Sequence, residues 1–235
     1  MTTIAPIALA AAGTTTLAVL AARVGWPGRR IAALLGGAVA LAAAAAVGEQ
    51  GGLSAHMAEH SLIAFVAAPL FALSGPVALV LRALRPSGRA RLLHVLRSRP
   101  VAALTHPAVT WTLFVAAIWV AHLTPALRAS ESAPLLHGAE HAGLLAVSML
   151  FWLPVLGANP LPHRLEGGAR SAYLFGAVGA GDLAGAIFIG QGNQEAGAVM
   201  LAGMLPLALA AVLVTWRWLA QEERRAVRLE GAQGA

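Results

Sequence analysis

Residues 56–76 read HMAEHSLIAFVAAPLFALSGP, a polar opening followed by an apolar run that closes on a Gly-Pro turn. A helix needs about 20 mostly apolar residues to cross a bilayer, and this stretch supplies them. Six further segments meet the same criterion. The sequence therefore predicts an all-α polytopic membrane protein with seven transmembrane helices, at 4–22, 31–48, 57–81, 107–127, 138–157, 171–190 and 197–219. For the first segment a cleaved signal peptide is the alternative, although its opening Met-Thr-Thr carries no basic residue.

Composition supports a membrane protein and excludes several other classes. Of the 235 residues, 58% are hydrophobic and only 11% are charged, whereas soluble domains average about 25% charged. The net charge of +6 comes from short arginine clusters between apolar runs, so we expect no nucleic-acid partner. The absence of cysteine excludes disulfides, thiolate metal sites and iron–sulfur clusters. Metal chemistry would therefore have to use histidine, carboxylate or methionine.

The arginines predict the orientation. With seven spans, fifteen of the sixteen basic residues fall on one side of the membrane and only Arg128 falls on the other. The positive-inside rule then places the N-terminus outside and the C-terminus in the cytoplasm. We expect one transmembrane domain over residues 1–235, with a cytoplasmic tail at 220–235, in a bacterial inner (plasma) membrane. The basic loop 82–100 is interpreted as a cytoplasmic loop that fixes this topology.

Histidines gather at one predicted depth. Five of the eight lie at the outer ends of the third, fourth and fifth spans, and three acidic residues, Glu49, Glu59 and Glu140, lie at the same level. Residues 56–60 and 137–141 both read H-x-x-E-H at the start of a span, so each helix presents two imidazoles on one face. Because both spans run in the same direction, the motifs are predicted to lie at equal height. The predicted metal ligands are His56, His60, His122, His137 and His141, with Glu59 and Glu140 as ligands or as partners of the imidazoles.

Other interpretations of these patterns stay open. H-x-x-E-H is also the inverted zincin protease pattern, and paired histidines can hold a b-type haem. Met200 and Met204 are four residues apart and could offer thioethers to Cu(I), with apolar packing as the simpler alternative. Asp182 lies near the middle of a span among small residues, where an interhelical hydrogen bond or a proton-linked role would fit. His106, directly before Pro107, is predicted to start a helix.

Several motifs together resemble the CtaG-type cytochrome c oxidase assembly factors. The resemblance covers roughly residues 50–220 and rests on the His-Met-x-x-His opening at 56–60 with Pro69 and Gly75-Pro76, His106-Pro107, Trp119-x-x-His122, the His137 and His141 pair, and Phe151-Trp152. Histidines 56, 60, 122, 137 and 141 match the family's by position. Glu59 stands where many members have glutamine, which makes the ligand set more anionic.

The resemblance implies a non-enzymatic role in oxidase maturation. The protein would bind copper, with zinc as the alternative ion, at an outward-facing histidine cluster and deliver it to a cytochrome c oxidase subunit under assembly. Two other functions are compatible with the residues: an intramembrane metal-dependent hydrolase, with a glutamate activating bound water, and a metal or proton transporter. The inner halves of the third and fifth spans are nearly all apolar, which disfavours transport. The sequence does not decide between a monomer and a homo-oligomer.

Overall fold

The computed structural model describes residues 4–124 and 133–233, and every regular element in these ranges is helical. In chain order the elements are α1 (Ile4–Arg23), α2 (Gly28–Gly48), α3 (Leu53–Leu62), the π-helix η1 (Ile63–Ala67), α4 (Ala68–Ser74), α5 (Pro76–Ala83), α6 (Pro86–Leu96), α7 (Arg99–Leu104), α8 (Pro107–Leu123), α10 (Pro134–Leu156), α11 (Gly167–Gly190), α12 (Gln194–Gly203) and α13 (Leu205–Gln233). The predicted all-α class is confirmed.

Five stretches are long and apolar enough to cross a membrane by length and composition: Gly28–Gly48, Leu53–Ala83, Leu135–Leu156, Gly167–Gly190 and Gln194–Glu230. They correspond to five of the seven predicted spans. The predicted span 107–127 corresponds to α8, a shorter apolar helix of 17 residues, and residues 125–127 lie outside the described chain. The predicted span 4–22 corresponds to α1, which packs along α2. The count of seven stays a prediction.

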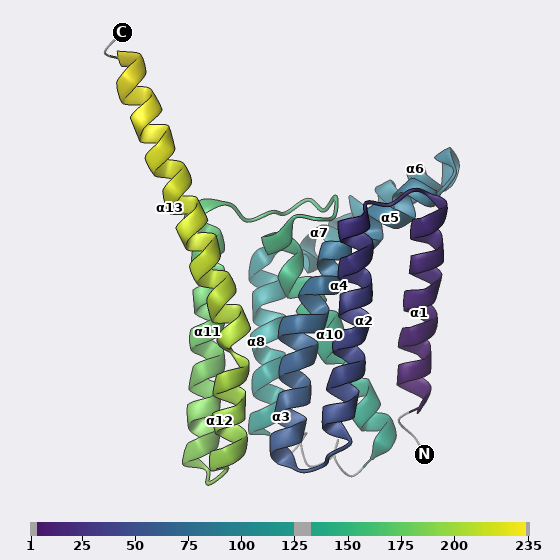
Figure 1. Cartoon of the computed structure of the whole chain (residues 1–235), viewed down its shortest axis with the longest axis vertical. Coiled ribbons are helices and arrows are strands. Elements are labelled where there is room, and N and C mark those ends of the chain that lie inside the picture. Colours follow the sequence, from purple (N-terminus) through teal and green to yellow (C-terminus); the bar gives the residue numbers. More distant parts are fainter. Residues whose placement is uncertain (1–3, 125–132, 234–235) are drawn as a thin grey trace.

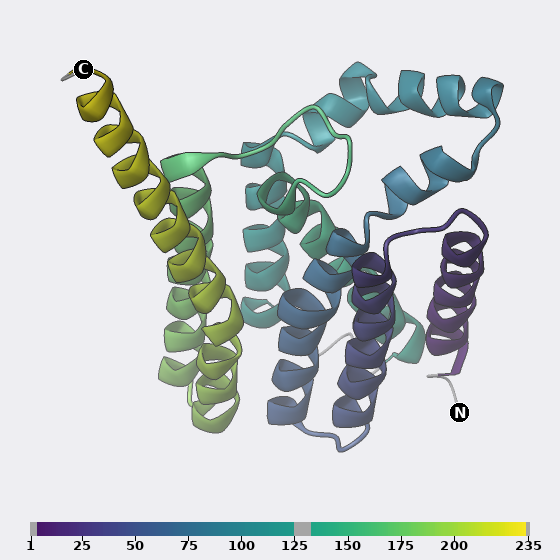
Figure 2. The same cartoon turned by 45° about the horizontal axis from the view of Figure 1, so that its top comes forward.

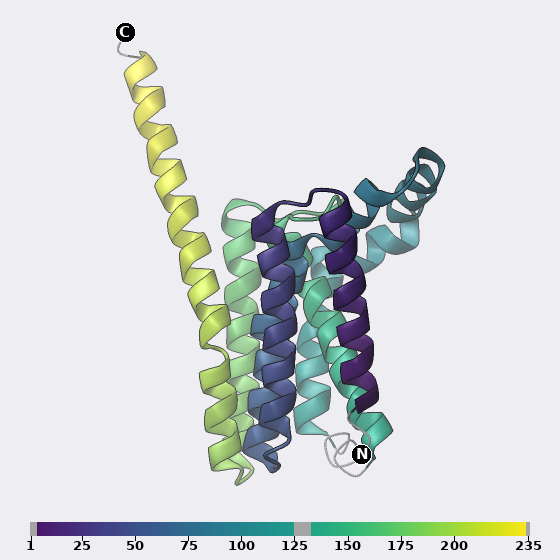
Figure 3. The ribbon, with the colours of Figure 1, turned by 45° about the vertical axis from the view of Figure 1, so that its right-hand side comes forward.

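The bundle has two chemically different ends (Figures 1 and 3). The α1–α2 connection, helices α5 to α7, the α10–α11 connection and the far end of α13 all lie at one end, uppermost in Figure 1. These segments carry the arginine clusters, and we call this the arginine end. The α2–α3 and α11–α12 turns and the starts of α3 and α10 lie at the opposite end. Arg128, predicted for that opposite end, is outside the described residues.

The basic segment 82–100 is more structured than its prediction as a loop. It forms α6 and parts of α5 and α7, which lie across the arginine end (Figure 2). Each of these three helices has a proline in its first two positions. Proline is favoured there because the first helical N–H groups have no acceptor within the helix and the fixed φ of proline suits the helix.

An aromatic stack joins three of the long helices. The ring of Phe151 on α10 stacks on Phe114 of α8, with centroids 4.2 Å apart, and on Tyr173 of α11, at 4.8 Å. The Tyr173 hydroxyl donates to the Phe151 carbonyl at 3.0 Å and lies 2.9 Å from the Thr110 hydroxyl. The two hydroxyl groups and the Phe151 carbonyl are therefore hydrogen-bonded within the protein, as an apolar environment requires.

A π-turn follows the first H-x-x-E-H motif. The N–H of Ala68 bonds to the carbonyl of Ile63, five residues back, and Pro69 has no N–H to offer the next carbonyl, that of Ala64. The indole of Trp152 on α10 donates to Ala64 O at 3.0 Å instead. One side chain thus satisfies the carbonyl that the π-turn and the proline leave without a backbone donor, and it ties α10 to this span just beyond the motif.

Replacing this indole is expected to destabilise the protein. The Trp152→Phe variant keeps an aromatic ring but leaves the Ala64 carbonyl buried without a donor, at a cost of about 1–3 kcal/mol. We expect a lower thermal unfolding midpoint in detergent, followed by circular dichroism. The matched control is Trp216→Phe on α13, where the side chain is 64% exposed. Equal midpoints for the two variants would contradict this role of Trp152.

Candidate metal centre

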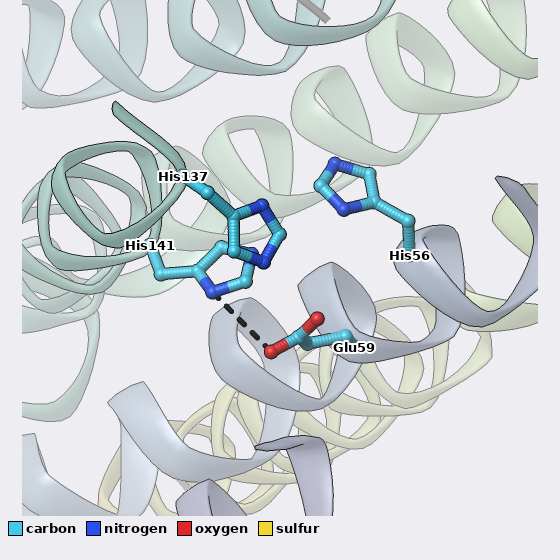
Figure 4. A group of neighbouring side chains, drawn as sticks. All are labelled: His56, Glu59, His137 and His141. Carbon is cyan, nitrogen blue, oxygen red and sulfur yellow. Dashed lines mark ion pairs between the residues drawn. The ribbon is translucent and has the colours of Figure 1, made fainter. Parts of the chain in front are cut away.

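Seven histidine and glutamate side chains converge at the end of the bundle opposite the arginine end. They come from three helices that are far apart in the sequence, and the four with the least exposure are only 4–6% exposed. Figure 4 shows two of the side chains from α3 facing two from α10. The structure thus brings together all the side chains predicted from the sequence: His56, Glu59 and His60 on α3, His122 at the end of α8, and His137, Glu140 and His141 on α10.

Helical geometry pairs the imidazoles within each motif. The ring centroids of His56 and His60 are 4.1 Å apart, and those of His137 and His141 are also 4.1 Å apart. Between the motifs, the centroid of His141 lies 5.1 Å from that of His60 and 5.7 Å from that of His56. Because α3 and α10 start at the same end (Figure 1), the two pairs meet at one level.

Each glutamate reaches across to the other motif. Glu59 Oε1 lies 3.2 Å from His141 Nδ1, the contact dashed in Figure 4. Glu140 Oε1 lies 3.9 Å from His56 Nε2 and 3.8 Å from His60 Nε2. Carboxylates beside imidazoles orient the rings and raise their basicity as ligands. Because each carboxylate lies beside an imidazole of the other motif, the two motifs form a single unit.

His122 joins the cluster with a defined tautomer. Its Nδ1–H donates to the Ile118 carbonyl at 2.6 Å, because a carbonyl can only accept. The neutral ring therefore presents the lone pair of Nε2, which lies 3.1 Å from Nδ1 of His60. A backbone partner that fixes the tautomer in this way is common among metal-binding histidines.

The donor set fits a metal ion. Two overlapping groups have one ligand atom from each residue within 4.8 Å of the others: His56, Glu59, His137 and His141, and His56, His60, Glu140 and His141. Both groups draw on both motifs. The buried Nε2 atoms of His56, His60 and His141 make no hydrogen bond within the described chain, and such atoms call for an additional partner. Imidazoles on one ion at about 2.0–2.1 Å cannot be more than about 4 Å apart, so small side-chain movements would close either group.

The remaining ionisable candidates lie elsewhere. Glu49 is exposed at the end of α2, and Asp182 is half-buried on α11; neither belongs to a metal-binding group in the described chain. His94 is exposed on α6. His106 caps α8 by accepting the Ala108 N–H at Nδ1, at 3.3 Å, which confirms its prediction as a helix start. Its ring lies 5.1 Å from that of His163, far from the cluster.

The fold and the cluster define a class: a multi-helix membrane protein with a buried histidine and glutamate group that could hold a metal. The family model described as cytochrome c oxidase caa3 assembly factor (Caa3_CtaG) matches residues 11–194. The chain belongs to this family of oxidase assembly factors, and the resemblance predicted from the motifs is confirmed.

Similar curated proteins occur in mycobacteria. Uncharacterized proteins of Mycobacterium tuberculosis (strain CDC 1551 / Oshkosh) and Mycobacterium leprae (strain TN) are 34% and 32% identical to the chain over 161 residues, which is 64% of this chain and 24% of each relative. The chain thus spans about a quarter of the length of these relatives. No solved structure gives a significant match.

A glycine that the sequence did not single out makes room for one of the glutamates. A Cβ at Gly48, the last residue of α2, would collide with the carboxylate of Glu59. Glycine therefore lets α2 end against this side chain while Glu59 reaches His141, and a larger residue would push the carboxylate aside. Small residues at membrane helix contacts commonly serve such close approach, but the sequence alone does not indicate which of many glycines does so.

The Gly48→Ala variant should displace the Glu59 carboxylate from His141 without changing any candidate ligand. We expect the affinity for Cu²⁺, used as a probe ion in isothermal titration, to fall by about 10–100-fold, as for other partners of metal-binding imidazoles. Gly143→Ala is the matched control, because a Cβ at that position on α10 meets no atom within 4 Å. Equal Cu²⁺ affinity in both variants would show that the position of Glu59 does not matter.

Proposed function

We propose that this protein binds copper at its histidine and glutamate cluster and passes the ion to a cytochrome c oxidase under assembly. The observation that carries the proposal is the convergence of five imidazoles from three helices, with buried Nε2 atoms of both motifs left without a hydrogen bond. Family membership supplies the oxidase context. Imidazole binds copper and zinc alike, so the oxidase context favours copper.

The geometry suits an ion that must be held and then released. Neutral imidazoles bind through a lone pair, and the cluster offers more donors than one ion requires. His56 and His141 belong to both candidate groups, so an ion could exchange ligands one at a time while these two stay bound. The cross-paired glutamates orient the rings and add negative charge that favours a cation. Such a carrier makes and breaks no covalent bond of a substrate, so no catalytic residue is assigned.

The membrane orientation is part of the same proposal. The arginine end faces the cytoplasm by the positive-inside rule, which places the cluster near the outer face of a bacterial plasma membrane. The two ends of the described chain lie at opposite ends of the bundle (Figure 1), which is compatible with an odd number of crossings. We therefore propose seven spans with the N-terminus outside, and an oxidase subunit that takes up copper on that side.

Substitutions within the cluster should be non-additive. His56→Ala and His141→Ala should each remove most of the copper bound to purified protein, because both residues belong to both ligand groups. The double variant should then lose little more, as expected within one ligand set. Metal content is measured by mass spectrometry, with the exposed His94→Ala as control. If each single variant kept about half the metal and the double variant lost nearly all, each helix would hold its own ion and the shared site would be wrong.

Reporter fusions test the topology. A fusion after Arg228 should be active with a cytoplasmic reporter and inactive with alkaline phosphatase, which needs the oxidising outer compartment. An alkaline phosphatase fusion after Gln50, in the α2–α3 turn, should be active, because this turn is predicted to lie outside. Phosphatase activity at Arg228 would place the cluster on the cytoplasmic side and remove the proposed route to the oxidase.

A further inference from the structure

A small cavity lies beside the cluster, further into the bundle along the first motif's span. Its volume is about 20 Å³, enough for one water-sized particle. His60 and His122 line it on the side of the cluster, and apolar side chains from η1, α8 and α10 complete it. Three methionines also line it, namely Met57 on α3, Met200 on α12 and Met204 directly after α12.

We propose that this cavity is a second copper site, selective for Cu(I), in which His60, His122 and the thioethers of these methionines are the ligands. The inference rests on the proposed copper function and extends it. It assigns the oxidation state Cu(I) to the ion and places one of its binding sites further into the bundle than the cluster. The ion enters and leaves as Cu(I), so no electron is transferred.

Ligand chemistry separates the cavity from the neighbouring cluster. Thioethers are soft ligands that favour Cu(I), whereas carboxylates favour harder ions. Residues lining the cavity include no carboxylate, while both groups in the cluster contain one. The two sites would therefore prefer different ions, although they share His60.

The placement of the methionines is unusual for simple core filling. The chain has only five methionines, and three of them line this one cavity. Met149 on α10 packs against the core and is not among the lining residues. Methionine is flexible enough to fill irregular gaps, and close-packed interiors hold few voids of this size. Three methionine side chains around a cavity that they leave unfilled indicate a binding site for a ligand.

Two glycines allow close packing around α12, so that Met200 and Met204 can line the cavity. A Cβ at Gly203 of α12 would collide with the Ser61 hydroxyl on α3, and a Cβ at Gly181 of α11 would collide with the end of the Met204 side chain. Both contacts depend on the missing side chain. The first contact lets α12 pack against α3, and the second leaves room for the Met204 thioether against α11.

Water is a poorer occupant than a soft ion. A buried water needs two to four polar partners, but two polar contacts around the cavity are already made within the protein. Nδ1 of His60 lies 3.1 Å from Nε2 of His122, and the Ser61 hydroxyl donates to the Met57 carbonyl at 2.9 Å. The thioethers that remain are weak hydrogen-bond acceptors but good ligands for Cu(I).

His60 connects the two sites through its two ring nitrogens. Nε2 faces Glu140 in the cluster at 3.8 Å, and Nδ1 faces His122 at 3.1 Å. An ion at Nδ1 requires that nitrogen to be deprotonated, and the neutral ring then carries its proton on Nε2, which faces Glu140. The two sites therefore use different tautomers of the same imidazole. His60 can thus serve as a ligand in either site.

X-ray absorption at the copper edge tests the proposal on the full-length protein loaded with Cu(I) under reducing conditions. We expect sulfur neighbours in addition to imidazole nitrogen. The triple variant M57L/M200L/M204L should lose the sulfur neighbours and bind Cu(I) at least about tenfold more weakly, measured by competition with a chromogenic chelator. Met149→Leu is the control and should match the wild type. Zn²⁺ loading, measured in parallel, reports on the histidine and glutamate cluster and should be unchanged in the triple variant.

Two results would overturn the second site. One is a wild-type spectrum with only nitrogen or oxygen neighbours, which needs no variant and so does not depend on how the triple variant folds. The other is unchanged Cu(I) affinity in a folded triple variant. A third result separates the two proposals. If wild-type protein binds neither Zn²⁺ nor Cu²⁺ but still shows sulfur-bound Cu(I), the metal site in the cluster is refuted and the Cu(I) site in the cavity is supported.

Discussion

Reciprocal pairing between carboxylates and imidazoles is the interaction on which the rest of this structure depends. Glu59 on α3 contacts His141 on α10, and Glu140 on α10 faces His56 and His60 on α3. Inside a membrane protein such groups are costly unless they pair with one another. Two helices that carry the same motif at the same height can each supply what the other needs, and this fixes their relative position.

The packing around the cluster serves this pairing. Trp152 satisfies the carbonyl left open by the π-turn just beyond His60, and π-turns within helices are frequent at functional sites. Gly48 lets α2 end against the Glu59 carboxylate. These contacts act on backbone and carboxylate positions rather than on a metal, so they build the donor set before any ion binds, as a preorganised site requires.

Two donor sets of different hardness, joined at His60, suit a protein that moves an ion instead of keeping it. The cluster combines imidazoles with carboxylates, and the cavity combines imidazoles with thioethers. Because soft ligands favour Cu(I), the proposed cavity site would hold Cu(I) more tightly than the cluster does. If the protein carries copper as proposed, such graded binding would help it both to hold and to release the ion.

The sequence alone determined the all-helical class, the family and the equal height of the two motifs, because apolar length and the spacing of His56 and His60 act within single helices. It also marked Met200 and Met204 as an adjacent pair. Only the tertiary structure decided that Met57 joins them from another helix, that Gly48 makes room for Glu59, and that each glutamate serves the opposite motif. Those outcomes depend on how helices distant in the chain approach and rotate against one another, which no local pattern encodes.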